Sequence, residues 1–578
     1  MSNRSTFRPR LPAVACLVAL AAATAPEGPA AATVVLNNVD PPGAGFNDPT
    51  PTAPVGGNPG ATLGEQRRIV FQFAADLWGS LLESDSEIVV QAAFRSLPCS
   101  TGSALLASSG AVRALADFPG AAFAGTWYPP ALANKLAGYD LTAGAPDPGL
   151  LAAPFNDDVY LTLNVSLDAD PSCLAGVGWY YGLDNAAGAA VDLLNVMVHE
   201  MAHGLGFANF IDETTGEGPG GLPDVYSRYT FDTATGRHWH EMTDAERVAS
   251  ARRAGQVVWD GPHVTAQAPH VLGPRPVLAV LPPSTLTGEY EVTTATFGPP
   301  PGEPGVAGEL ALAFDGSGTT SDACEPLAGD YAGTIVLADR GTCTFANKAA
   351  RAQEAGAVGV VVVNNDPVGL PSMTGQDASI TIPAVGLSLA DGQALKAELP
   401  GLEGVIGVDP QKLAGTDDDD HVRLLADGRS GSAISHWDLV ATPNLLMEPV
   451  FAPDLRATET VDLTTRVMAD VGWDECPDSD FSPALRLGAC DPGVANQVLD
   501  DGCTIADLLE ACATGADYDV PCVRSTASML VDLGLVDHQQ RAAIQRCARR
   551  PDGMKPPKPP RTERASGLDT PPRGRGQF

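Results

Sequence analysis

One short stretch constrains this chain more than any other: VMVHEMAHGLGFAN at residues 196–209. It places two histidines, His199 and His203, four positions apart, with Glu200 beside the first. Residues four apart on an α-helix lie one turn from each other on the same face, so both imidazoles can reach one ion. In H-E-x-x-H motifs the ion is zinc and the glutamate acts as general base. The stretch therefore predicts a helix that carries part of a catalytic zinc site.

The motif leaves a third ligand to be found, because catalytic zinc sites usually take three protein ligands. Asn209 holds the position, three residues past Gly206, where many zinc proteases keep that ligand. A neutral amide oxygen is a poor zinc ligand beside imidazole. His436 stands out instead, because it lies in an S-H-W triplet and Met447 follows eleven residues later in LLMEP.

Five other histidines compete for the third position: His238, His240, His263, His270 and His421. The first two flank a tryptophan in a polar, turn-rich stretch, and the next two lie in loops beside prolines. Surface positions are expected for all four. The last follows the acidic run Asp417–Asp420, which predicts a solvated loop and only weakly a Ca²⁺ site.

Length and charge limit what the whole chain can be. A chain of 578 residues is too long for one hydrophobic core, so three or four domains are expected. The net charge of −35 argues against nucleic-acid binding, which needs a positive face. Beyond the N-terminus no stretch reaches the roughly 18 apolar residues of a membrane span, so no transmembrane anchor is predicted.

The N-terminus has the layout of a secretory signal peptide over residues 1–32. Three arginines precede an apolar run from Leu11 to Ala23, and small residues follow, including Ala30–Ala32. The apolar run is too short to cross a bilayer. We therefore expect a secreted, extracellular protein.

The cysteines agree with an oxidising compartment. Cys16 belongs to the signal peptide, which leaves an even number of cysteines without the C-x-x-C spacing of structural zinc sites. Spacing leaves the connectivity open. It suggests local pairs, namely Cys99 with Cys173, Cys324 with Cys343, and six cysteines paired among themselves between Cys476 and Cys547.

Hydrophobic periodicity before the motif indicates both helices and strands. Residues 63–82 have helical spacing and follow a capping box. Residues 87–94 and 159–167 are predicted strands, and strict alternation in the second predicts one buried and one open face. The motif helix is expected from about 185 to a glycine near 204–206. This order of elements predicts an α+β domain.

A different pattern begins near residue 276. GTIVLADRG at 333–341 predicts a strand, TFANKAARAQEAG at 344–356 a helix, and VGVVVVNN at 358–365 a buried strand. Together with IPAVGLSLADGQAL at 382–395, this region resembles the protease-associated (PA) domain family. The resemblance implies an α/β unit over residues 276–412 that has no catalytic residues of its own and binds protein or shapes substrate access.

The motif and the S-H-W triplet together resemble the leishmanolysin-like zinc proteases of the metzincin group. That family has a helix reading H-E-M-A-H-A-L-G-F, a long insertion, then S-H-W and a methionine turn. The departure here is an insertion long enough to hold a whole PA domain. The resemblance implies zinc ligands, a general base, and two structural residues near the site: His199, His203 and His436; Glu200; Gly206 and Met447.

The same resemblance implies how substrate binds. Zinc proteases of this kind pair an extended peptide with an open strand edge, and we expect the strand at 159–167 to supply that edge. Met447 is implied to lie in an apolar floor beneath the metal and not to coordinate it. A protein or peptide is therefore the expected partner.

These patterns predict a metzincin-type α+β catalytic domain with an inserted α/β PA domain and a helical, disulfide-bonded C-terminal module. The predicted segments are 1–32 signal peptide, 33–275 first catalytic part, 276–412 PA domain, 413–474 second catalytic part, 475–548 Cys-rich helical module and 549–578 disordered basic tail.

We predict a secreted zinc endopeptidase with one catalytic Zn²⁺. One alternative is an extracellular binding or adhesion protein that has lost activity and uses its PA and C-terminal modules. Another is a zinc amidase that cleaves cell-wall peptides. The four intact residues His199, Glu200, His203 and His436 argue against the first alternative.

Overall fold

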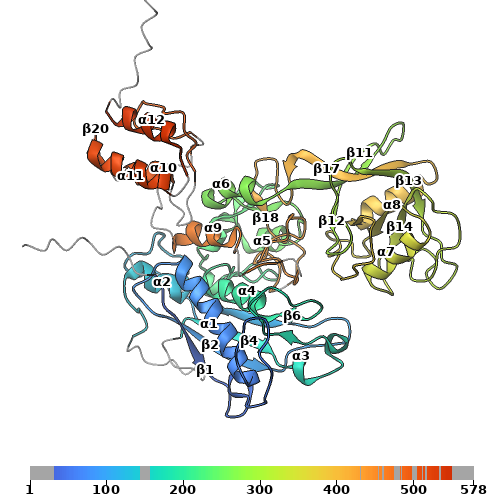
Figure 1. Ribbon diagram of the computed structural model, residues 1–578, viewed down its shortest axis with the longest axis horizontal. Coiled ribbons are helices and arrows are strands. Elements are labelled where there is room, and N and C mark those ends of the chain that lie inside the picture. Colours follow the sequence, from blue (N-terminus) through green and yellow to red (C-terminus); the bar gives the residue numbers. More distant parts are fainter. Residues whose placement is uncertain are drawn as a thin grey trace, which may run out of the picture.

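The computed structural model divides into a main body, a lobe built around an eight-stranded sheet, and a small C-terminal helical module (Figure 1). The predicted signal peptide, apart from its last two residues, and the predicted basic tail beyond Arg549 lie outside the described residues. The structure describes residues 31–143, 157–429, 431–452, 455–457, 461–473, 482, 484–497, 504–510, 512–514, 517–532 and 535–549.

The main body begins with a four-stranded sheet in the order β1-β2-β4-β3. The first three strands are parallel, and β3 runs antiparallel to β4 at the edge. Two helices belong to the same core: the Trp78 indole of α1 donates to the Val198 carbonyl of α4 at 3.1 Å. The elements are β1 (Val34–Asn38), α1 (Leu63–Leu81), β2 (Ile88–Arg95), β3 (Ala107–Ala111), α2 (Pro130–Ala137), β4 (Val159–Asn164), α3 (Ser166–Ala169) and α4 (Leu193–Leu205).

Two sequence expectations for this sheet are corrected. The strand predicted at 159–167 ends at Asn164, and the chain then turns into the short helix α3. This strand, β4, is also not an edge, because it pairs with β2 on one side and β3 on the other. The edge next to β4 is β3, and β1 forms the opposite edge. The β3 sequence ASSGA has no hydrophobic alternation and gave no strand signal.

The motif helix α4 begins later than predicted, at Leu193, and ends at Leu205 as expected. The chain just before it forms β6 (Val191–Asp192), which pairs with β5 (Trp179–Tyr180). The Asp192 carboxylate then accepts the backbone N–H groups of Leu194 and Asn195, an N-cap that starts the helix. Gly206 closes it at φ +143°, a conformation that side chains disfavour.

Gly204 lets α4 lie directly against β4. A Cβ atom on Gly204 would stand 2.2 Å from Cγ1 of the fully buried Val159. We expect Gly204→Ala to lower the free energy of unfolding by about 1–3 kcal/mol, because overpacking outweighs the better helix propensity of alanine. Denaturant unfolding measures this, and adding Val159→Ala should restore part of the loss. A Gly204→Ala variant as stable as the wild type would contradict the packing.

The second lobe is built on one mixed sheet. Strands β13, β14, β15 and β16 are parallel, and the remaining pairs are antiparallel. In spatial order the strands are β11 (Gly288–Glu291), β10 (Pro274–Val280), β17 (Glu403–Leu413), β13 (Val306–Leu312), β14 (Thr334–Asp339), β15 (Gly359–Val363), β16 (Ala384–Leu387) and β12 (Thr293–Thr294).

Two helices cover the two faces of this sheet. Alternate residues of β15 point to opposite sides: Val360 and Val362 share a core with α7 (Phe345–Glu354), and Val361 shares one with α8 (Leu389–Ala397). The predicted strand, helix and buried strand therefore correspond to β14, α7 and β15.

The chain leaves and re-enters the main body side by side. Strands β10 and β17 pair antiparallel where the lobe begins and ends. Beyond them, β18 after the lobe pairs with β9 before it, and the Gly273 N–H donates to the Thr442 carbonyl at 2.7 Å. The elements of this region are β7 (Thr230–Asp232), β8 (Arg237–His238), α5 (Asp244–Ser250), β9 (Val257–Trp259), α6 (Pro262–Val271), β18 (Val422–Arg423) and α9 (Thr464–Met468).

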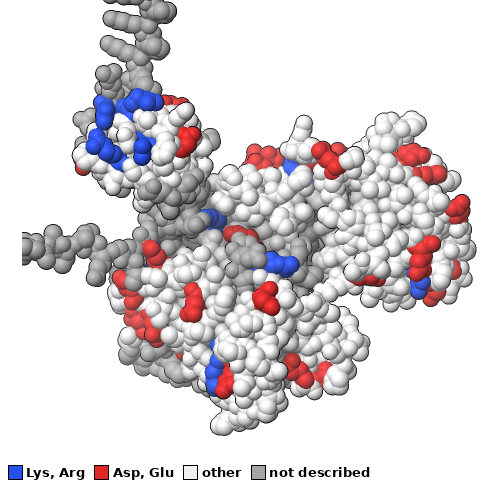
Figure 2. Space-filling model, in the orientation of Figure 1, with Lys and Arg blue, Asp and Glu red and all other residues white. Residues whose placement is uncertain are grey.

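The C-terminal module has its own apolar core, built largely from its helices. Figure 2 shows basic side chains gathered on this module, whereas acidic ones are scattered over the rest of the viewed surface. No helix among the described residues is long and apolar enough to cross a membrane. The elements are α10 (Ile505–Glu510), β19 (Ala513–Thr514), β20 (Asp517–Tyr518), α11 (Val520–Asp532) and α12 (His538–Ala548).

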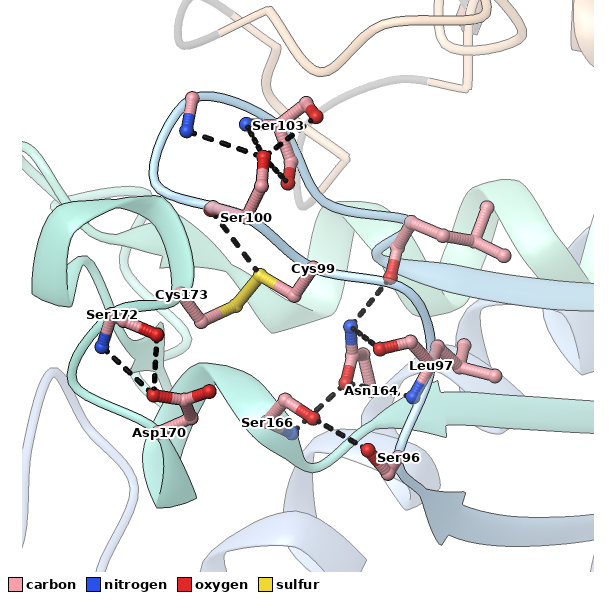
Figure 3. The surroundings of a disulfide bond; sticks show 12 residues. Ser96, Leu97, Cys99, Ser100, Ser103, Asn164, Ser166, Asp170, Ser172 and Cys173 are labelled. Atoms are coloured by element: carbon pink, nitrogen blue, oxygen red, sulfur yellow. Dashed lines mark hydrogen bonds between the residues drawn. A yellow bond between two sulfur atoms is a disulfide. The ribbon is translucent and has the colours of Figure 1, made fainter.

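Four disulfides join described residues, including both specific pairs that spacing suggested. The Cys99–Cys173 bond ties the segment after β2 to the chain that follows α3 (Figure 3). The others are Cys324–Cys343, Cys490–Cys547 and Cys512–Cys522. Two cysteines of the predicted C-terminal cluster, Cys476 and Cys503, lie outside the described residues.

Candidate metal centre and cleft

The structure brings together three histidines that are far apart in sequence. His199 and His203 come from α4, and His436 comes from the segment after the second lobe. One ring nitrogen of each lies within 4.8 Å of the other two. The Nε2 atoms of His199 and His203 are 3.2 Å apart, and the ring centroids of His203 and His436 are 4.9 Å apart.

Each imidazole is oriented by a backbone carbonyl. The Nδ1 atoms of His199, His203 and His436 lie 2.6, 2.7 and 2.7 Å from the carbonyl oxygens of Leu446, Phe207 and Ser432. A carbonyl can only accept, so each Nδ1 carries the proton and each Nε2 keeps its lone pair. Partners of this kind fix the tautomer of metal-binding histidines.

Burial also keeps the three rings neutral. Loss of hydration lowers the pKa of His199 to about 4 and that of His436 to about 3, and it holds the pKa of His203 well below its ordinary value. Neutral imidazole is the form that binds metals. Three neutral, oriented Nε2 donors at this spacing fit the ligand set of a Zn²⁺ ion with an open fourth position.

Glu200 lies on the same helix and lines the same cleft as the three histidines. Its residue exposure is only 8%, and burial raises the pKa of its carboxyl to about 8. No ion pair to Glu200 occurs among the described residues. Glu200 therefore places a carboxyl group inside the cleft that forms no ion pair with a described residue.

Asn209 is engaged elsewhere. Its side-chain amide donates to the Ile211 carbonyl at 2.8 Å and, more weakly, to Glu213 at 3.4 Å, and its Oδ1 accepts the Ile211 N–H. Its backbone N–H donates to the Ser435 hydroxyl at 3.0 Å. Asn209 thus ties the loop after α4 to the residue before His436.

Met447 lies in a tight turn beside the histidines. The Leu445 carbonyl accepts the Glu448 N–H, and the Glu448 carboxylate accepts the Leu445 N–H. The Met447 side chain is fully buried, and its carbonyl accepts the Trp437 N–H at 2.9 Å. The turn therefore contacts α4 through Leu446 and the His436 segment through Met447.

A cleft of about 930 Å³ surrounds the histidine cluster. Strand β3 lines it along its whole length, and the loop at 208–213 and residues 448–451 also contribute. Thr374 of the second lobe reaches the cleft, and nearby Gln376 donates to the Gly188 carbonyl of the main body at 2.8 Å. The second lobe therefore forms part of the cleft wall.

The competing histidines lie outside this cluster. Predicted surface positions are wrong for His263, because it sits in α6, is 3% exposed and bonds to Asp470 at 2.8 Å. The predicted loop around His270 is likewise the end of α6. His238 bonds to Asp260 at 2.7 Å. His240 lies next to it in a short 3₁₀ turn.

The acidic loop at 417–421 is held by its own side chains. Asp417 accepts the backbone N–H groups of Asp419 and His421 and lies 3.2 Å from the His421 ring. One ligand atom of each of these three residues lies within 4.8 Å of the others. A Ca²⁺ ion at this loop stays a prediction.

Sequence reasoning missed the residues that orient the histidines. Three are backbone carbonyls, which leave no trace in a side-chain pattern. The fourth is Asp462, whose carboxylate accepts the Leu446 N–H at 2.5 Å. An aspartate two residues before the helix start at Thr464 is a cap-like signal that could have drawn attention to it.

Comparison with known proteins covers only parts of the chain. A region of 107 residues is 32% identical to a probable leucine aminopeptidase 2 of Arthroderma benhamiae, and covers 18% of this chain and 20% of that protein. Another match, to a probable leucine aminopeptidase 2 of Aspergillus fumigatus, is 35% identical over 115 residues and covers 19% and 22%. A PII-type proteinase of Lactococcus lactis subsp. cremoris is 44% identical over 66 residues, 11% of this chain and 3% of that one.

Among solved structures, a zinc aminopeptidase from Bacillus subtilis has a TM-score of 0.20 and 20% identity, over 32% of this chain and 42% of that one. That score is too low to carry an argument about fold. The chain spans about a fifth or less of the length of the curated relatives above. The PA domain family model matches residues 306–395, inside the eight-stranded lobe, and this chain therefore contains a PA domain.

Proposed function

We propose that this protein is a secreted zinc-dependent endopeptidase. The observation that carries the proposal is one cleft that holds three neutral, oriented imidazoles, the uncommitted carboxyl group of Glu200 and an edge strand. His199, His203 and His436 would hold one Zn²⁺ ion. The four disulfides between described residues support export to an oxidising compartment.

A Zn²⁺ ion held by these three histidines would lower the pKa of a water molecule and polarise the scissile carbonyl. The protein supplies the rest. Burial alone raises the pKa of the Glu200 carboxyl to about 8, and the charge of a bound cation would favour its ionised form. The Glu200 carboxylate would then accept the proton of the attacking water and deliver it to the nitrogen of the leaving amine. The carbonyl partners of the three Nδ1–H groups hold the imidazoles in place throughout the reaction.

Strand β3 is the proposed platform for substrate. It is one of the two edge strands of its sheet and lines the cleft. An extended peptide can therefore pair with it and extend past the site on both sides of the scissile bond. A substrate held through its backbone on both sides of the scissile bond needs no free terminus. This geometry supports internal cleavage, whereas the partial relatives are named aminopeptidases.

The proposed domain organisation follows from the pairing of the chain around the PA lobe. Residues 33–275 and 413–474 would form one metzincin-type catalytic domain, because β9 and β18 join them across the insertion. The inserted segment 276–412 would shape access to the cleft, where Thr374 already forms part of the wall. A role in binding protein partners is compatible with the same position.

A peptidase assay tests this function. We expect the purified protein to degrade casein and to cleave internal bonds of a peptide acetylated at its N-terminus and amidated at its C-terminus. A chelator should stop cleavage, and added Zn²⁺ should restore it. Cleavage restricted to free N-termini would favour an aminopeptidase. Zinc binding without cleavage of any peptide would favour the inactive binding protein, and cleavage of cell-wall peptides alone would favour the amidase.

A further inference from the structure

We infer that Asp462 is a positioning residue for the metal centre, acting on His199 through the backbone of Leu446. The Asp462 Oδ2 atom accepts the Leu446 N–H at 2.5 Å. The carbonyl of the same Leu446 accepts the Nδ1–H of His199 at 2.6 Å. This inference rests on the proposed zinc site and names a residue that touches neither metal nor substrate.

The Leu445–Glu448 turn links two of the three imidazoles. Its Leu446 carbonyl orients His199, and the next carbonyl, of Met447, accepts the N–H of Trp437, the neighbour of His436. Adjacent carbonyls of one turn therefore set the position of the first histidine relative to the third. A rotation of the turn would move the rings of both His199 and His436. The contacts that fix the turn therefore also fix the distance between these two ligands.

The contacts of Asp462 fix the position of the Leu445–Glu448 turn. Its other oxygen accepts the Thr464 N–H at 3.1 Å and lies 3.0 Å from the Thr464 hydroxyl, which anchors the carboxylate at the start of α9. Its backbone lies at φ +47°, in the left-handed region that non-glycine residues rarely adopt. Strained backbone of this kind persists where surrounding contacts fix it, and it is concentrated at functional sites.

A second strained residue lies in the segment that carries His436. Ile434 has φ +68°, unusual for a β-branched residue, two positions before His436. Its N–H donates to the Leu425 carbonyl at 2.6 Å, and its carbonyl accepts the Tyr226 hydroxyl at 3.0 Å. The Asp462 segment and the His436 segment, which meet at the turn, thus each contain a non-glycine residue with positive φ. Such backbone strain is expected where the fold fixes the ligand geometry before the metal binds.

Two variants of the full-length protein test the inference: Asp462→Ala, which removes the acceptor, and Asp462→Asn, which keeps one acceptor oxygen. We expect zinc affinity, measured by competition with a chelator, to fall about 10- to 100-fold for the alanine variant, as for other residues that orient metal ligands. The asparagine variant should fall in between. The absorption spectrum of the Co²⁺-substituted protein should change in the same order, because it reports ligand geometry.

The metal-free protein gives a readout that is independent of zinc. Imidazole ¹⁵N shifts should show the Nδ1–H tautomer at His199 in the wild type and a mixture of tautomers in Asp462→Ala. If the wild type binds no zinc, the proposed function fails, and the tautomer still decides the inference. An unchanged His199 tautomer in Asp462→Ala would overturn it, even if zinc affinity fell.

Asp232→Ala is the matched control. Asp232 is also a buried aspartate that accepts a backbone N–H, from Thr235, and it pairs with Arg253 away from the cleft. Its replacement should reduce stability but leave zinc affinity and the His199 tautomer as in the wild type. Equal losses of zinc affinity in the Asp232 and Asp462 variants would mean general loosening of the fold and would also overturn the inference.

Discussion

Replacing Glu200 by alanine is expected to lower kcat/KM for peptide cleavage by about 10³-fold, within the range for loss of a general acid–base group, while the protein keeps its zinc. The reason is geometric. The three imidazoles are each held by a backbone carbonyl, and none of these contacts involves Glu200. Removing the carboxylate therefore removes the proton acceptor and leaves the donors for the metal in place.

The measurement combines zinc content by metal analysis with turnover of an internally quenched peptide. Glu200→Gln keeps the side-chain volume and should be as inactive as the alanine variant, which separates loss of the carboxylate from loss of packing. Glu217→Gln is the control, because Glu217 is an exposed glutamate of the same body outside the cleft. Turnover near the wild-type value in zinc-loaded Glu200→Ala would refute the proposed role of Glu200.

The second large effect is expected at His436. His436→Ala should weaken zinc binding by more than the roughly 10- to 100-fold that is typical for residues behind the ligands, and activity should be lost with the metal. Asn209→Ala should leave metal content nearly unchanged. The Asn209 amide bonds within its own loop, and its contact with Ser435 is made by the backbone N–H, which alanine retains.

Dialysis of both variants against a mild chelator, followed by metal analysis, distinguishes the two residues. Circular dichroism and the unfolding midpoint of each variant show whether the fold survives the substitution. If Asn209→Ala loses its metal and His436→Ala keeps it, the third ligand is misassigned. The proposal of one catalytic domain interrupted by the PA lobe would then lose its main chemical support.

Local features of the fold could be predicted from the sequence. A capping box, in which Thr62 and Glu65 bond reciprocally, begins α1, and Gly206, one of the predicted closing glycines, ends α4. The alternation and helical spacing in the second lobe correspond to β14, α7 and β15. The reason is that hydrophobic period, caps and glycine conformations depend on residues a few positions apart.

Other features depended on contacts between distant parts of the chain. The edge strand β3 carries the sequence ASSGA, and only its pairing with β4 makes it a strand. His263 is buried because Asp470, more than two hundred residues away, accepts its N–H groups. Strand order and the burial of a single polar side chain follow from such long-range pairing, which leaves no local period.

The candidate site likewise has features that depend on local sequence and features that depend on long-range contacts. The sequence by itself determined which side chains are available for the proposed zinc chemistry: two histidines one helical turn apart, a glutamate between them, and a third histidine in S-H-W before Met447. Only the tertiary structure decided how that chemistry is held, through the carbonyls of Ser432 and Leu446 and the carboxylate of Asp462. The physical reason is that a metal site needs particular side chains as ligands, whereas any residue can supply the backbone carbonyl that orients them.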